Sequence, residues 1–169
     1  MKKALLIVIV AVLSGCTGLP EGVDPVRGFE VDRYLGRWYE IARLDHSFER
    51  GLERVTAEYS LRDDGGIAVL NRGFSPESGE WKEVAGRAYF ADRRDVGHLE
   101  VSFFGPFYSS YVVFELDPEY RYAFVSGYDR SYLWLLARTP EVEPALLQHF
   151  REKAGQLGFA VDGLILVRQ

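Results

Sequence analysis

Sulfur-containing and imidazole side chains are scarce in this chain of 169 residues, which has one cysteine, one methionine and three histidines. With a single cysteine, no disulfide can form within the chain. The cysteine and the histidines are not spaced like the ligands of a structural zinc ion, so no metal site is expected. The 25 acidic residues outnumber the 20 basic ones, and the resulting net charge of -5 argues against a nucleic-acid-binding surface.

The remaining composition is that of one folded domain. Hydrophobic residues make up 47% of the chain and charged residues 27%, which excludes both a disordered chain and a bundle of membrane helices. Aromatic residues reach 14%, a high share for a chain of this size.

Residues 1–15 have the pattern of a secretory signal peptide, with a basic start at Met1-Lys2-Lys3 and an apolar run from Ala4 to Leu13. The run is too short for a permanent membrane helix. The sequence Leu13-Ser14-Gly15-Cys16 resembles the lipobox of bacterial lipoproteins, which implies that Cys16 is acylated and becomes the first residue. The alternative is an ordinary signal peptide followed by an incidental cysteine. Thr17 stands where inner-membrane lipoproteins carry Asp, which favours the outer membrane.

Residues 16–30 are predicted to be the lipidated N-terminus and a tether, because glycine and proline recur there without any apolar period. The folded domain is predicted to be residues 31–169. Removal of residues 1–15 takes away two lysines and leaves a mature side-chain charge of -7.

From residue 31 onward, short alternating runs and turn residues recur about every ten residues, which is typical of a sandwich or a barrel. In Val55–Arg62, for example, Val55, Ala57 and Tyr59 share one face. We predict strands at residues 36–44, 55–62, 67–74, 81–91, 98–104, 108–116, 121–128 and 132–138, and a short last strand at 164–167.

One helix is predicted near the C-terminus. Pro144 suits its first turn, Phe150 and Ala154 share one face with three leucines, and Gly158 suits its end. The expected fold is therefore all-β, an eight-stranded antiparallel up-and-down β-barrel with one C-terminal α-helix. Closing the sheet into a barrel removes its exposed edges.

Three short blocks resemble the signature motifs of the lipocalins, in the same order along the chain: Gly36-Arg37-Trp38-Tyr39, Gly127-Tyr128-Asp129-Arg130 and Leu135-Leu136-Ala137-Arg138-Thr139-Pro140. With the lipobox, the chain is most similar to the bacterial lipocalins and to the apolipoprotein D branch. The resemblance implies that Gly36, Trp38 and Arg138 are structural, with Arg138 packed over the ring of Trp38 at the closed end. It also implies a fatty acid or lysophospholipid as the ligand, and no cofactor.

The inward faces of the strands are expected to line a ligand cavity, although each apolar member has plain core packing as its alternative. Polar tips of Tyr59, Asn71 and Tyr111 would bond one another, water or a ligand, and Ala57, Gly86 and Ala88 would leave volume. The predicted lining residues are Tyr59, Val69, Asn71, Ala88, Phe103, Tyr111, Val113 and Trp134.

Three further features of the sequence bear on function. Glu40 shares parity with Trp38, and we expect a strand bulge to turn it outward, since a buried carboxylate needs a partner. Residues 45–51 are expected to form a solvated lid without a catalytic triad, with His46 and Arg50 providing any head-group recognition. The aromatic residues of 104–108 would either contact a membrane or pack the turn.

We therefore expect a lipid-anchored outer-membrane lipocalin that binds an amphipathic lipid for storage or transport in the envelope. No catalytic residue is assigned, since no conventional nucleophile and base are paired. The rival interpretations are a lipocalin-fold enzyme acting on a lipid or isoprenoid, a scaffold with a filled barrel, and a binder of ring ligands. A homodimer is left open.

Overall fold

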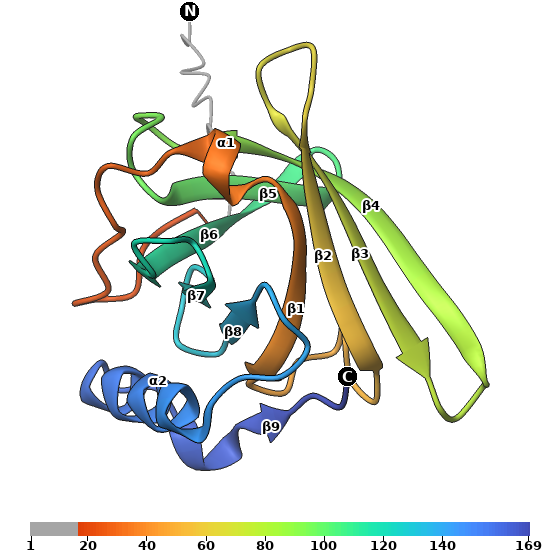
Figure 1. The fold of residues 1–169 in the computed structure, drawn as a ribbon. Helices are drawn as coiled ribbons and strands as arrows, with labels where there is room; N and C mark the ends of the chain where they lie inside the picture. Colours follow the sequence, from red (N-terminus) through yellow and green to blue (C-terminus); the bar gives the residue numbers. More distant parts are fainter. Residues whose placement is uncertain (1–16) are drawn as a thin grey trace, which may run out of the picture.

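The computed structural model describes residues 17–169. The predicted signal peptide at residues 1–15 and the predicted lipidation site at Cys16 lie outside the described residues. The described chain forms a barrel with a helix packed on its outside (Figure 1). Its elements are α1 (Val31–Tyr34), β1 (Gly36–Arg43), β2 (Glu53–Leu61), β3 (Ile67–Ser75), β4 (Glu80–Phe90), β5 (His98–Phe104), β6 (Phe107–Leu116), β7 (Tyr122–Ser126), β8 (Leu133–Ala137), α2 (Pro144–Gln156), the 3-10 turn η1 (Val161–Gly163) and β9 (Ile165–Leu166).

The eight main strands close into an antiparallel barrel because β1 pairs with both of its neighbours. Trp38 lies opposite Ala57 of β2, and Tyr39 lies opposite Ala137 of β8. The other strands pair in sequence order, from β2 to β8, and β9 adds two residues to the free part of β1. The predicted fold class is confirmed, and each predicted strand has its counterpart in the structure.

The barrel has one closed and one open end. Strand β1 starts beside α1 at the closed end and finishes at the loop to β2, at the opposite end (Figure 1). Because the strands run up and down, the turns after β3, β5 and β7 also lie at the open end. The mouth is therefore bordered by residues 44–52, 76–79, 105–106 and 127–132.

Helix α2 covers part of the outer wall. Phe150 and Ala154 are fully buried against the outward faces of β6, β7 and β8. The centroid of the Phe150 ring lies 4.9 Å from that of the Phe124 ring. The helix ends before Gly158, whose φ of 83° suits glycine. The predicted helical face and its stop are both observed.

Residues 20–29 pack on the barrel, so the predicted tether of residues 16–30 corresponds to no free segment over this stretch. Val23 is buried among the outer-wall residues, Val26 exchanges backbone hydrogen bonds with Val113 and Gly97, and Phe29 is buried at the closed end. The glycines and prolines that suggested a tether belong instead to a segment that crosses the outside of β6. In the described part of the chain, no helix is long and apolar enough to cross a membrane.

Candidate functional site

The closed end of the barrel is sealed around Trp38, which is 0% exposed. Its indole N–H donates to the carbonyl of Tyr34 at 2.8 Å. The guanidinium of Arg138 lies 3.9 Å from the centroid of the indole ring and donates to the carbonyls of Arg33 and Arg37 at 2.8 and 2.9 Å. These contacts tie β1, β8 and α1 together below the barrel interior.

The structure brings seven of the eight predicted lining residues into one apolar cluster inside the barrel. Asn71 lies on the same inner face, opposite Ala57 and Val84, and its buried Oδ1 has no hydrogen-bond partner. The seven are Tyr59, Val69, Ala88, Phe103, Tyr111, Val113 and Trp134.

Part of this inner wall is still reached by solvent. Ala57, Phe103, Tyr111 and Trp134 point into the barrel and yet remain partly exposed. The inner face of the barrel is therefore not sealed from solvent at these four positions. One predicted source of volume is wrong: a Cβ on Gly86 would lie 2.6 Å from the ring of Phe103, so that ring already occupies the space.

Three tyrosine hydroxyls meet inside the barrel. The hydroxyl of Tyr111 lies 2.7 Å from that of Tyr34 and 3.0 Å from that of Tyr59. Burial raises the pKa of all three phenols, so they are neutral at physiological pH. Tyr59 and Tyr111 thus form a hydrogen bond with each other, which is one of the alternatives expected from the sequence. Tyr34 also forms a hydrogen bond with Tyr111.

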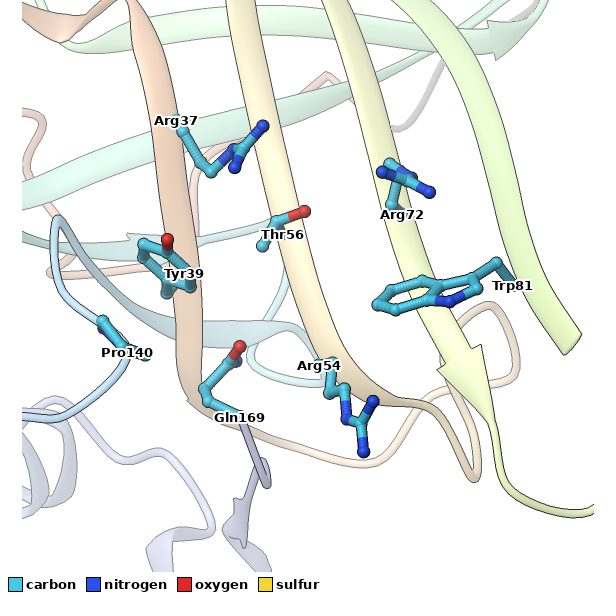
Figure 2. Close-up of a pocket in the computed structure, with 8 residues that line it drawn as sticks. All are labelled: Arg37, Tyr39, Arg54, Thr56, Arg72, Trp81, Pro140 and Gln169. Carbon is cyan, nitrogen blue, oxygen red and sulfur yellow. The ribbon is translucent and has the colours of Figure 1, made fainter. Parts of the chain in front are cut away.

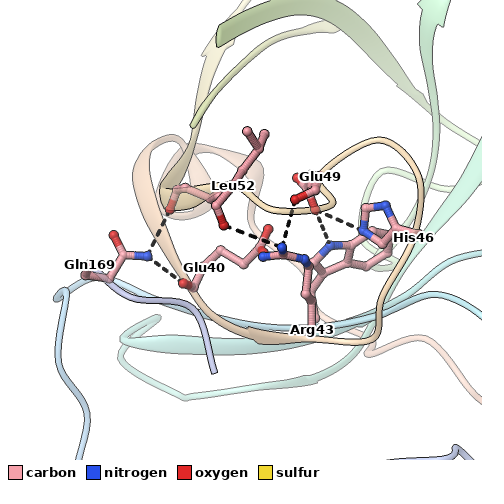
Figure 3. Close-up of polar contacts among 8 residues, drawn as sticks. Glu40, Arg43, His46, Glu49, Leu52 and Gln169 are labelled. Carbon is pink, nitrogen blue, oxygen red and sulfur yellow. Dashed lines mark hydrogen bonds and ion pairs between the residues drawn. The ribbon is translucent and has the colours of Figure 1, made fainter. Parts of the chain in front are cut away.

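A buried ion pair lies near the mouth (Figure 3). Glu40 is 3% exposed, and its carboxylate accepts from Arg43 at 2.8 Å. The predicted outward turn of Glu40 is wrong. A bulge does exist, but it falls between Glu40 and Ala42, so it leaves Glu40 inward and brings Arg43 inward as its partner.

The loop between β1 and β2 is fastened to this pair. Arg43 donates to the carbonyl of Glu49 at 2.8 Å, and the carboxylate of Glu49 lies 2.9 Å from Nε2 of His46 and 3.2 Å from the indole nitrogen of Trp134. His46 is buried, so the prediction of a fully solvated lid is wrong. Arg50, by contrast, is exposed and forms an ion pair with Asp45.

The pKa values of the two buried carboxyl groups are shifted in opposite directions. Burial, reinforced by the neighbouring Glu49, raises the pKa of Glu40 well above its ordinary value. Burial also acts to raise the pKa of Glu49, but the hydrogen bond and charge of His46 and the N–H of Trp134 hold it below its ordinary value. Glu49 therefore loses its proton more readily than Glu40 does.

Sequence reasoning missed Arg43, Glu49, Tyr34 and Leu52. Regular alternation along β1 would place Arg43 outside, and only the bulge reverses it. Leu52 reaches inward because Gly73 leaves it room: a Cβ on Gly73 would lie 2.9 Å from a methyl group of Leu52. A glycine on an inner strand face was the available signal for such a close approach.

A hollow of about 260 Å³ lies on the outer wall and was not predicted (Figure 2). Arg37 and Arg72 on its border are bound to Glu58 and Glu83, and the guanidinium of Arg54 lies over the ring of Phe74. These pairings balance much of its positive charge. The hollow is lined by Arg37, Tyr39, Arg54, Thr56, Arg72, Trp81, Pro140 and Gln169.

In residues 17–169, no group of three or more histidine, cysteine or acidic side chains is arranged to hold a metal ion. A closed eight-stranded barrel with a sealed floor and an apolar inner wall is the architecture of the small barrels that can hold one ligand.

The chain belongs to the lipocalins: the lipocalin-like domain family matches residues 29–169. It is 60% identical to the outer membrane lipoprotein Blc of Vibrio cholerae, over 100% of this chain and 99% of the relative. It is 32% identical to apolipoprotein D of Rattus norvegicus, over 88% and 86% of the two chains. Among solved structures, insecticyanin from Manduca sexta has a TM-score of 0.72 at 20% identity, with 90% and 87% of the chains covered.

The likeness to insecticyanin supports the fold alone, whereas the sequence relatives bear on location. The match to an outer membrane lipoprotein includes the N-terminal segment, and shorter matches to proteins of the same name occur in Citrobacter freundii and Escherichia coli. The predicted lipid-anchored location at the outer membrane is confirmed.

Proposed function

We propose that this lipocalin binds an amphipathic lipid, a fatty acid or a lysophospholipid, inside the barrel, and stores or carries it for maintenance of the envelope. The observation that carries the proposal is the partly exposed apolar inner wall above a sealed floor. An acyl chain placed there would remove apolar surface from water, at about 25 cal/mol per Å² before ordering costs.

The polar groups at the mouth suit a ligand with one polar end. The Glu40–Arg43 pair and Glu49 lie close to Trp134, so a head group at this level would meet charged side chains rather than hydrocarbon. Head-group recognition by His46 and Arg50 remains a prediction, and in this structure both side chains are engaged with carboxylates of their own loop.

We propose binding without a reaction, and acylation of Cys16 as the anchor. The named sequence relatives are lipoproteins and lipocalins, which supports a binding role. A homodimer remains a prediction.

Photocrosslinking tests the proposed ligand site in the full chain. Cells expressing the protein would be supplied with a fatty acid that carries a diazirine, irradiated, and the crosslinked peptides mapped. We expect crosslinks on the strands that carry Tyr111 and Trp134. Ala57→Phe, which fills the interior, should reduce them at least about tenfold.

Thr56→Phe is the matched control, because Thr56 precedes Ala57 on β2 and borders the outer hollow. It should leave the interior crosslinks unchanged. Crosslinks confined to outward-facing residues, or equal effects of the two substitutions, would refute the interior site.

A further inference from the structure

The hollow on the outer wall of the barrel concentrates positive charge in a chain that is acidic as a whole. Its eight lining residues include three arginines and no acidic residue, whereas the whole chain has a net charge of -5. Arg37, Arg54 and Arg72 come from β1, β2 and β3 and border the hollow on different sides (Figure 2). A small site bordered by cations from three strands is suited to an anion.

The strand register places two hydroxyl groups on the same outward face. Tyr39 of β1 lies opposite Thr56 of β2, and Thr56 lies opposite Arg72 of β3. Neighbouring strands are about 4.8 Å apart, so these three residues form a row about 10 Å long across the wall. The row offers one guanidinium and two hydroxyls to the same small ligand.

Two of the arginines have acidic partners that lie outside the lining of the hollow. Arg37 pairs with Glu58, Arg72 pairs with Glu83, and both pairs are exposed to water. Exposed ion pairs are weak, and a guanidinium has five N–H donors, of which a bidentate carboxylate uses two. Both arginines therefore keep donors for a ligand.

Arg54 borders the hollow from a strained position of the backbone. Its φ is 51°, in the left-handed region that favours glycine, and it lies between Glu53 and Thr56, where the register of β2 against β3 shifts. Its N–H donates to the carbonyl of Arg168 at 2.6 Å. Within residues 17–169, its guanidinium has no acidic partner. An arginine held where glycine would fit with less strain points to a function for its side chain.

We infer that this hollow binds a phosphate group. The oxygens of a phosphate point in several directions, so one phosphate can accept from Arg37, Arg54 and Arg72 and from the hydroxyls beside them. A planar carboxylate matches guanidinium groups in one plane only. Trp81 is 47% exposed and lies across β3 toward the hollow, where its ring can pack on the group that carries the phosphate (Figure 2). The expected ligand is a phosphomonoester with a small ring or apolar part.

Titration calorimetry of the full lipidated chain with phenyl phosphate, in micelles of dodecyl maltoside, tests the site. We expect one phenyl phosphate to bind per chain. Arg54→Gln should lower the affinity at least about tenfold, because it removes the cation that has no acidic partner. Arg151→Gln is the matched control, since Arg151 is also exposed and without an acidic partner in the described chain but lies on α2. It should leave the affinity unchanged.

Two further variants show on which side of the wall the phosphate binds. Thr56→Phe fills the outer hollow and should lower the affinity for phenyl phosphate at least about tenfold. Ala57→Phe fills the interior and should leave this affinity unchanged. The proposed interior lipid responds to the same two variants in the opposite way, so each proposal can fail without the other.

Arg54→Gly separates binding from folding. Glycine adopts a φ of 51° with little strain, so the urea midpoint should stay at or above that of the wild type. The affinity for phenyl phosphate should fall as it does in Arg54→Gln.

Phosphatidic acid added to the micelles identifies the source of the phosphate. Weaker binding of phenyl phosphate would show that a lipid head group competes for the hollow, and unchanged binding would assign the hollow to a soluble phosphomonoester. Three results would overturn the inference: no binding of phenyl phosphate to the wild type, an affinity that Arg54→Gln leaves unchanged, or a loss in Ala57→Phe with none in Thr56→Phe.

Discussion

The guanidinium of Arg138 stacks 3.9 Å from the centroid of the Trp38 ring and donates hydrogen bonds to three backbone carbonyls, those of Arg33, Arg37 and Tyr120. One side chain thus joins the end of β8 to β1, α1 and the turn before β7. The contact between Arg138 and Trp38 that the signature motifs imply therefore lies where these four segments meet.

Arg138→Ala should destabilise the fold by about 2–4 kcal/mol, because it removes the cation–π contact and leaves three carbonyls without this donor. Arg138→Lys keeps the charge but not the planar guanidinium, so its stability should lie between those of the wild type and Arg138→Ala. Urea unfolding measures the effect. Arg37→Ala, which breaks an exposed ion pair with Glu58, is the control and should cost less than about 1 kcal/mol. Equal losses for the two alanine variants would contradict the assigned role.

Tyr111→Phe should destabilise the protein by about 1–3 kcal/mol. The substitution removes the hydroxyl that lies between those of Tyr34 and Tyr59, and both would lose a buried partner. Tyr108→Phe removes a hydroxyl at the surface, which accepts from Arg87, and should change stability by less than about 0.5 kcal/mol. Thermal unfolding of the two variants separates these outcomes, and a neutral Tyr111→Phe would show that water replaces the hydroxyl without cost.

Glu40→Gln should become more stabilising, relative to the wild type, as the pH rises. Burial and the adjacent Glu49 raise the pKa of Glu40, so the folded protein holds this proton more tightly than the unfolded chain does. The stability that the proton contributes is complete below about pH 4.3 and is lost as the pH rises through the folded pKa. Glutamine keeps an oxygen for Arg43 and cannot ionise.

The difference in unfolding free energy between Glu40→Gln and the wild type should therefore grow from pH 4.3 toward neutrality, by at most about 1.4 kcal/mol per pH unit. Urea unfolding at several pH values measures it. Glu58→Gln, at an exposed ion pair, controls for general charge effects. A difference that is flat or shrinks with pH would show that Glu40 is ionised in the folded state across this range.

The strands were predictable because one face of each is apolar and turns punctuate the chain. His98–Phe104 matches β5 at both ends, and α2 has Pro144 in its first turn and ends before Gly158, as predicted. Local alternation and turn chemistry set these boundaries, so a single sequence is enough to find them. The inward parity of Tyr59, Phe103 and Trp134 followed from the same alternation.

The arrangement at the mouth was not predictable in the same way. The position of the bulge in β1 decides whether Glu40 and Arg43 face inward or outward, and the pairing with β8 sets that position. His46 is buried because Glu49, Tyr132 and Trp134 surround it, and the last two come from the distant segment at the start of β8. Residues 20–29 follow the outer wall through contacts with β6 that no local pattern announces.

The most direct test of the account is native mass spectrometry of the full lipidated chain, followed by lipid extraction from the same preparation. We predict a bound mass, beyond that of the anchor, that matches a fatty acid or a lysophospholipid. It should be lost in Ala57→Phe and retained in Thr56→Phe. A protein free of bound lipid that takes up none when fatty acid or lysophospholipid is added would contradict the account and favour a scaffold with a filled barrel.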